Sequence, residues 1–150
     1  MITEEFNRSA TGEHPFLRVR IPSRPRFVRK VRRELADFAQ RHHIDRTDLI
    51  EFTFAVGEAL ANAIEHSGTT GMIEITFSVE REKIEATITD SGRGMRGNAA
   101  NLRFPDAYAE RGRGFPIMKH CADIFAVSTL PGDGTSVTLG RRLTHAPAVS

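Results

Sequence analysis

The chain has 150 residues, of which 39% are hydrophobic and 27% are charged. This composition is typical of one globular domain that buries a core, and it excludes a disordered tail. The single cysteine, Cys121, excludes an internal disulfide and is expected to be a small buried residue. Because 21 basic and 19 acidic residues leave a net charge of only +2, nonspecific nucleic-acid binding is not favoured.

The two ends of the chain lack the signals of membrane targeting. No apolar stretch approaches the roughly 18 to 20 residues of a membrane-spanning helix, and the first residues are acidic where a signal peptide is basic. We therefore expect a cytoplasmic protein that does not contact a membrane. Residues 1–14 and 144–150 show no hydrophobic periodicity and are expected to be flexible, which leaves one domain over residues 15–143.

Hydrophobic periodicity divides this domain into strands and helices. Apolar residues that alternate with polar ones predict strands, and apolar residues at three- and four-residue steps predict amphipathic helices. In chain order the patterns predict a strand over 16–21, helices over 25–42 and from Asp45 or Thr47 to His66, a hairpin of strands Met72–Glu80 and Lys83–Thr89, a short helix over Phe115–Ala122, and strands over Ile124–Leu130 and Ser136–Leu143. Phe54 and Phe77 are expected to lie in the core.

Residues 90–114 have no periodicity and contain five glycines. A long unpatterned loop in a small domain is more often a functional lid than a simple connection. The order of the other elements predicts a two-layer α/β sandwich, in which helices cover one face of a mixed, mostly antiparallel sheet.

The second predicted helix carries Glu58 and Asn62, which are four residues apart and project from the same side. Such a pair can be a solvated polar stripe. On a helix that is otherwise apolar, however, both groups need partners, and a metal ion with phosphates at the edge of a cleft would supply them.

Three glycine-containing segments follow the predicted hairpin. Asp90-Ser-Gly-Arg-Gly can be a sharp loop, or a site where the carboxylate accepts a hydrogen bond from an exocyclic amine and the glycines let backbone approach a flat ring. Arg111-Gly-Arg-Gly runs into a helix, where backbone N–H groups at the positive helix end can cradle phosphate. Gly134-Thr135 taken alone would be a routine hairpin turn.

Together these four segments, in this order, resemble the N box and the three glycine boxes of the GHKL ATPase superfamily, over about residues 15 to 143. The compact size and the Glu-Ala-x-x-Asn-Ala-x-x-His form of the helix motif most resemble bacterial anti-sigma factors that are also serine-protein kinases. The resemblance implies the Bergerat-type ATP-binding fold and a Mg²⁺-ATP-dependent protein serine/threonine kinase.

The resemblance also implies roles for matching residues. It makes Glu58 the general base and Asn62 the residue that holds Mg²⁺ against the ATP phosphates. Its implied nucleotide-binding residues are Asp90 on the adenine amine, Gly92 and Gly94 in the base pocket, Gly112 and Gly114 around the phosphates, Arg111 or Arg113 beside them, and Thr135 at the adenine side. Phosphoryl transfer needs such metal, cationic and N–H stabilisation with an oriented nucleophile. Which of the two arginines contacts phosphate is left open.

Eight basic residues lie between Arg18 and Arg33. They can form a solvated face, and a nucleic-acid patch is disfavoured because aromatic residues are not interleaved with them. In the resembling family the first strand and helix contact protein partners, so we expect an acidic protein partner at Arg29. The implied partners are a sigma factor, a STAS-type antagonist protein that is the kinase substrate, and a second copy of the chain in a homodimer, with no direct nucleic-acid contact.

One other function remains open from the sequence, and a third is disfavoured. The chain can be a non-catalytic partner-switching module, in which ATP only orders the lid for capture of another signalling partner. The detached ATPase domain of a histidine kinase is disfavoured, because no long dimerisation helix with a phosphorylatable histidine precedes the domain and the lid is short.

Overall fold

The structure is a computed structural model of the chain, and it describes residues 2–9, 12–67, 71–90, 124–129 and 134–144. These residues form six strands, two α-helices and a short 3-10 helix. In chain order the elements are β1 (Ile2–Ser9), β2 (Gly12–Pro22), η1 (Pro25–Phe27), α1 (Val28–Arg41), α2 (Arg46–Ser67), β3 (Met72–Glu80), β4 (Lys83–Asp90), β5 (Ile124–Thr129) and β6 (Thr135–Arg142).

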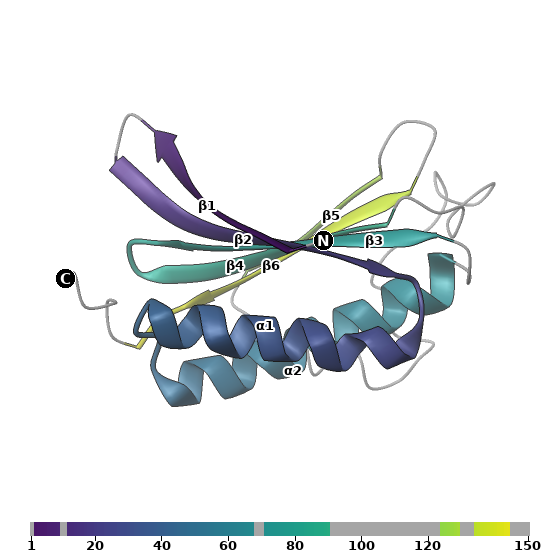
Figure 1. Cartoon of the computed structure of the whole chain (residues 1–150), viewed down its shortest axis with the longest axis horizontal. Coiled ribbons are helices and arrows are strands. Elements are labelled where there is room, and N and C mark those ends of the chain that lie inside the picture. Colours follow the sequence, from purple (N-terminus) through teal and green to yellow (C-terminus); the bar gives the residue numbers. More distant parts are fainter. Residues whose placement is uncertain (1, 10–11, 68–70, 91–123, 130–133, 145–150) are drawn as a thin grey trace.

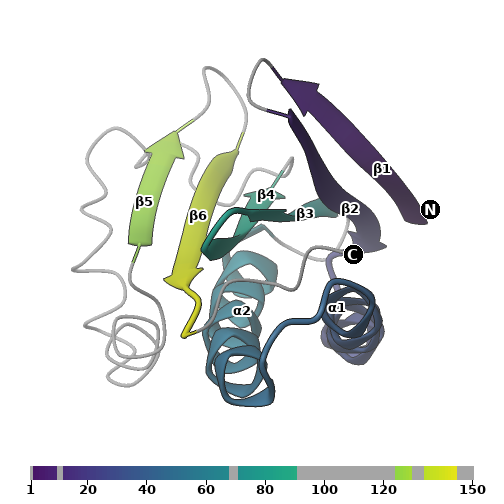
Figure 2. The same cartoon turned by 90° about the vertical axis from the view of Figure 1, so that its left-hand side faces the viewer.

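All six strands belong to one sheet in the order β1-β2-β3-β4-β6-β5 (Figures 1 and 2). Every pairing between the described strands is antiparallel, so the parallel component that a mixed sheet would contain is not found in them. The predicted hairpin is confirmed, because β3 pairs with β4 across the turn at Arg81 and Glu82. Arg81 has a φ of 53°, the left-handed conformation that such a tight turn requires.

The N-terminal segment differs from the expectation drawn from the sequence. Residues 1–14 lack periodicity, yet Ile2–Ser9 form β1, and β2 already begins at Gly12. β1 pairs with β2 from Ile2 opposite Val19 to Ser9 opposite Gly12. The structure thus has a strand where the sequence predicted a flexible end, because backbone hydrogen bonds to a neighbouring strand do not need an alternating sequence at the edge of a sheet.

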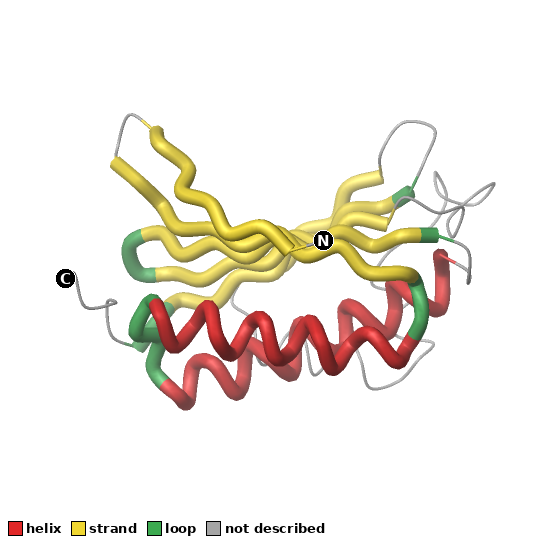
Figure 3. Tube along the Cα trace, viewed as in Figure 1, coloured by secondary structure: helices red, strands yellow, loops and turns green. Residues whose placement is uncertain are grey.

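Both α-helices lie on the same face of the sheet, which confirms the predicted two-layer α/β sandwich (Figures 1 and 3). α2 packs against β4 and β6, and α1 packs against α2 and β2. The largest fully buried side chains of the core between the two layers are Phe38, Phe52, Phe77, Leu17, Ile21, Leu35, Leu60, Ile73, Ile75, Ile84 and Ile88.

Of the two phenylalanines expected in the core, Phe77 is fully buried but Phe54 is 62% exposed. The prediction for Phe54 is wrong because of its position on α2. The buried row of this helix contains Phe52 and Val56, and Phe54 lies two residues from each, which places it on the opposite side. An apolar residue at that spacing faces solvent however apolar the rest of the helix is.

Candidate nucleotide-binding site

Three polar residues of the predicted site come together at one end of the two layers. Asp90 is the last residue of β4 and lies opposite Ile73 on one side and Thr135 on the other. Asn62 lies near the end of α2, which runs toward the same end of the sheet (Figure 1). The burial pattern decides which face of the sheet the two strand residues occupy.

Asp90 and Thr135 continue rows of buried residues that face the helices. In β4 every second residue is buried and Asp90 ends that row, while in β6 Thr135 begins the row that continues with Val137 and Leu139. Alternate residues of a strand point to the same face, so both polar residues lie on the face that α2 covers. Asn62, Asp90 and Thr135 are only 3%, 3% and 7% exposed.

Two of these buried residues have polar atoms without a partner. The side-chain nitrogen and oxygen of Asn62 and the hydroxyl of Thr135 are buried and make no hydrogen bond to any described residue. A buried polar group without a partner costs about 1 to 3 kcal/mol of stability. Native proteins leave few such groups, so a cluster of them at one end of a core indicates a place for a ligand.

Glu58 lies one helical turn before Asn62 on α2 and is half-buried. Residues four apart on a helix are neighbours, so the carboxylate lies beside the carboxamide but closer to solvent. This arrangement leaves the Glu58 carboxylate partly exposed beside the buried amide of Asn62. The structure thus keeps the predicted pair together on one side of α2.

The described residues fit Mg²⁺ and ATP as ligands that bind together. No group of three or more histidine, cysteine, aspartate or glutamate residues among them could hold a metal ion without help. Mg²⁺ is commonly held by one or two protein oxygens together with substrate phosphates. The carboxamide oxygen of Asn62, which bonds to no described residue, is suited to that role, and the Asp90 carboxylate and Thr135 hydroxyl are suited to the edge of a nucleotide base.

The remaining predicted site residues lie outside the described part of the chain. They are Gly92, Gly94, Arg111, Gly112, Arg113 and Gly114. The same holds for the predicted lid after Asp90, the short helix over Phe115–Ala122 and Cys121. The proposed phosphate cradle and the choice between the two arginines therefore stay predictions from the sequence.

A second buried polar cluster, at the other end of α2, is not identified by the sequence motifs. Asp48 lies in the first turn of α2 and is 0% exposed. Its carboxylate accepts hydrogen bonds from the Arg141 Nε at 3.0 Å, the Thr144 N–H at 2.8 Å and the Thr144 hydroxyl at 2.9 Å. Arg141 also forms an ion pair with Glu51. From the sequence, Asp48 is only an acidic residue near the start of a helix. Such a residue is expected to interact with the N-terminus of its own helix, and nothing in the sequence predicts its contacts with the distant Arg141 and Thr144.

The pKa of Asp48 reflects this environment. Burial alone raises the pKa of the carboxyl group. The hydrogen bonds from Thr144 and Arg141, with the positive charge of Arg141, outweigh burial and hold the pKa below its ordinary value. Asp48 is therefore a charged residue that stabilises the fold.

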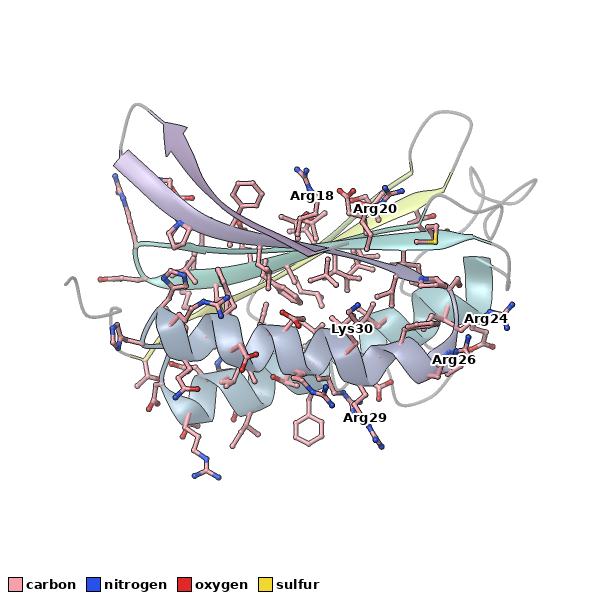
Figure 4. The ribbon with its side chains drawn as sticks, in the orientation of Figure 1. Arg18, Arg20, Arg24, Arg26, Arg29 and Lys30 are labelled. Atoms are coloured by element: carbon pink, nitrogen blue, oxygen red, sulfur yellow. The ribbon has the colours of Figure 1, made fainter. Side chains whose placement is uncertain are left out.

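The basic residues of the first strand and helix occupy two faces of the molecule. Arg18 and Arg20 lie on the uncovered face of the sheet, where both are within 4.0 Å of the Glu74 carboxylate (Figure 4). Arg24, Arg26 and Arg29 lie on the side of the helices (Figure 4). Arg29 is exposed and points away from the sheet. The eight residues thus do not form one continuous patch.

No helix among the described residues is long and apolar enough to cross a membrane.

The fold and the site together point to one class of protein. The fold is a two-layer sandwich with an antiparallel sheet, and the site has a buried carboxamide and a buried carboxylate at one end of it. The family model of the histidine kinase-like ATPase domain matches residues 21–141, which is most of the chain.

Similar proteins that carry functional names narrow this class to one family. The serine-protein kinase RsbW of Bacillus velezensis is 24% identical over 148 residues, which cover 89% of this chain and 92% of that protein. The anti-sigma F factor of Anoxybacillus flavithermus is 30% identical over 110 residues, which cover 68% of this chain and 75% of that protein. RsbW of Staphylococcus aureus is 25% identical over 139 residues, covering 85% and 87% of the two chains. The chain belongs to the anti-sigma factor and serine-protein kinase family of the histidine kinase-like ATPases.

Proposed function

We propose that the chain is an anti-sigma regulatory factor and a Mg²⁺-ATP-dependent serine/threonine kinase. Its substrate is a small STAS-type antagonist protein, and the chain sequesters a sigma factor when the antagonist does not engage it. It acts in the cytoplasm as a homodimer and does not bind nucleic acid directly. Membership of a family whose relatives are named as serine-protein kinases and anti-sigma factors supports this proposal.

The observation that carries the proposal is the cluster of buried polar atoms beside a partly exposed carboxylate. Asn62 and Thr135 bury polar atoms that have no partner among the described residues, and Glu58 lies one turn from Asn62 at the edge of the site. A purely structural cluster would satisfy its hydrogen bonds internally. A site for metal and phosphate with a base beside it explains both features.

Each residue then has a role in phosphoryl transfer. The Asn62 oxygen would hold the metal ion, and Asp90 and Thr135 would orient the base of the nucleotide. Mg²⁺-ATP supplies the γ-phosphoryl group when it is bound. Glu58 accepts the proton of the serine hydroxyl as the hydroxyl oxygen bonds to phosphorus and the bond from phosphorus to the ADP oxygen breaks. Such reactions depend mainly on positioning and on electrostatic stabilisation.

Calorimetric titration tests the nucleotide site. ATP is titrated into the native chain with and without Mg²⁺, and into the Asn62→Ala and Asp90→Asn variants. We expect metal-dependent binding to the native chain and its loss in both variants, because one removes the metal ligand and the other removes the carboxylate that accepts from the adenine amine. Failure of the folded native chain to bind ATP would exclude a kinase.

The Glu58→Ala variant separates a kinase from a non-catalytic switch. It is assayed for transfer of labelled γ-phosphate to purified STAS-domain proteins from the same organism. A kinase loses transfer by a factor of about 100 or more and keeps its ATP affinity, because only the base is removed. If the native chain binds ATP and these proteins but transfers no phosphate to any of them, the chain is a binding switch.

The partner-binding part of the proposal is supported by Arg29. Its side chain is exposed on α1 and points away from the sheet (Figure 4), and it has no ion pair with a described residue. A surface cation that has no ion pair in the described part of the chain is available for a carboxylate of a partner protein. Arg29→Glu is expected to weaken binding of the sigma factor or antagonist without changing ATP affinity.

A further inference from the structure

The outward side of α2 carries an apolar stripe that the core does not use. Ile50 and Phe54 are 47% and 62% exposed, and they are four residues apart, so they are neighbours on one side of the helix. Gly57, which is buried under Arg32, and Ala61, which is exposed, continue this row at the spacing of a helical face. The row from residue 50 to residue 61 is about 16 Å long, which is about three helical turns.

One arginine of α1, Arg32, lies against this stripe, and Arg29 and Arg33 are its neighbours on the same helix. Arg29, Arg32 and Arg33 are exposed, and none of them has an ion pair with a described residue. In Figure 4 Arg29 points away from the sheet on the helix side. Arg29, Arg32, Arg33, Ile50 and Phe54 together are called the α1–α2 outer face below.

Gly57 joins the two helices within this face. A β-carbon at Gly57 would lie 3.1 Å from the Nη2 atom of Arg32 and 3.7 Å from its Nε atom. The guanidinium of Arg32 therefore lies directly on the backbone of α2, between Phe54 and Ala61 in the row. This places a cation on the apolar stripe itself, one residue away from Glu58.

We propose that the α1–α2 outer face binds an acidic amphipathic helix of a protein partner. The apolar side of that helix covers Ile50 and Phe54, and its carboxylates pair with Arg32 and the neighbouring arginines of α1. The occupant is acidic because Arg32 and its neighbouring arginines have no ion pair with any described residue. It is helical because the stripe is straight and its spacing matches anchor residues at every third or fourth position.

The position of the stripe also explains how such a partner serves the reaction. Phe54 and Glu58 are four residues apart, so a helix on the stripe lies one turn from the proposed general base. In this respect the inference rests on the proposed function, since the bound partner is then the phosphate acceptor. Binding to the face does not itself need ATP, so the two proposals can fail separately.

A designed peptide tests the face directly. The probe is an 18-residue helical peptide with leucines along one side and glutamates on both flanks. Its controls are a scrambled peptide of the same composition and a peptide with lysine at every glutamate position. Fluorescence anisotropy measures affinity for the native chain, and ¹H–¹⁵N spectra locate the contact. We expect binding of the acidic amphipathic peptide only, weakened by salt, with shifts in residues 29–36 and 50–61.

Matched variants show which side chains bind the peptide. Phe54→Ser and Arg32→Glu are each expected to weaken binding roughly tenfold or more, because they remove an exposed anchor and reverse a charge at its centre. Phe54→Leu keeps an apolar anchor and should restore most of the affinity. Arg18→Glu makes the same charge change on the uncovered face of the sheet and should leave binding unchanged. Urea unfolding confirms that each variant is folded.

Several results would overturn the inference. Equal binding of the scrambled or lysine peptide, or equal affinity of the Phe54→Ser and Arg32→Glu variants, excludes this face. Self-association of the native chain that Phe54→Ser abolishes, seen by sedimentation, would assign the face to a second copy. A further such result is that duplex DNA displaces the peptide from the native chain and from Phe54→Leu but binds the Arg32→Glu variant poorly. That result would assign the α1–α2 outer face to nucleic acid.

ATP titration of the same preparation separates this inference from the proposed function. Peptide binding by a chain that does not bind ATP supports the docking face and excludes the kinase. ATP binding by a chain that does not bind the peptide supports the nucleotide site and excludes the face.

Discussion

The two ends of α2 bury polar side chains in opposite ways. Asp48, at the first turn, is fully buried, and its two oxygens accept three hydrogen bonds. Asn62, fourteen residues and about 21 Å further along the helix, is almost as buried, yet its amide group bonds to no described residue. The first arrangement stabilises the fold. The second costs stability, and a protein keeps such a group where a ligand completes its hydrogen bonds.

This comparison shows how burial and hydrogen bonding together separate structural from functional residues. By burial alone, Asp48 and Asn62 cannot be distinguished. The state of their polar atoms distinguishes them, and it predicts opposite effects when each is replaced.

Replacing Asp48 is expected to have the largest effect. Asp48→Ala removes three hydrogen bonds and leaves Arg141, which is 15% exposed, without its buried partner. Breaking a buried ion pair costs about 3 to 5 kcal/mol, and we expect a loss of about 3 kcal/mol in the free energy of unfolding. Urea unfolding measures it. ATP affinity of the folded fraction should be unchanged.

Glu51→Gln is the matched control for that change. Glu51 also pairs with Arg141 but is 36% exposed, so its loss should cost less than about 1 kcal/mol. Similar losses of unfolding free energy in the two variants would mean that the burial of Asp48 does not strengthen its interactions. The contrast between the two ends of α2 would then be contradicted.

The Asn62→Leu variant tests the other end of the helix. It replaces an unpartnered amide by an apolar side chain of similar size with a higher helix propensity. We expect the nucleotide-free chain to gain about 1 kcal/mol of stability and to lose metal-dependent ATP binding. Thermal unfolding with and without Mg²⁺-ATP measures both effects. A large loss of stability without ligand would instead make Asn62 a structural residue.

The pH dependence of stability provides a smaller test of the Asp48 cluster. The pKa of Asp48 is lowered in the folded chain, so its carboxylate contributes stability above the unfolded pKa of about 4. That contribution is lost as the pH falls through the lower, folded pKa. Urea midpoints of the native chain should therefore decrease below about pH 4. Asp48→Asn should show a shallower decrease, and parallel curves would contradict the role of this carboxylate.

The smallest effect is expected at Gly57, between the two ends. Gly57→Ala should raise stability by about 0.5 to 1 kcal/mol, because alanine favours the helix interior. The new methyl group would meet only the flexible head of Arg32 at 3.1 Å, which can shift by a few tenths of an ångström. Chemical unfolding checks the sign. A loss of stability would show that other contacts hold the guanidinium of Arg32 in place.

The sequence predicts one end of α2 better than the other. Glu58 and Asn62 share a helix side through local spacing, and Asp90 and Thr135 each have a glycine within two residues in the sequence. The Asp48 cluster could not be predicted in the same way. Its partners Arg141 and Thr144 lie 93 and 96 residues further along the chain, and no local pattern pairs residues at such separations.

Periodicity and polar spacing in the sequence by themselves determined α1, α2, the hairpin, the closing strands and the Glu58–Asn62 motif, because these depend on contacts within a few residues. Only the tertiary structure decided that β1 extends the sheet, that Phe54 faces outward, and that Arg32 lies on Gly57. It also decided which buried polar groups are satisfied and which are not. These properties depend on which surfaces pack together, and packing joins residues that are distant in the sequence.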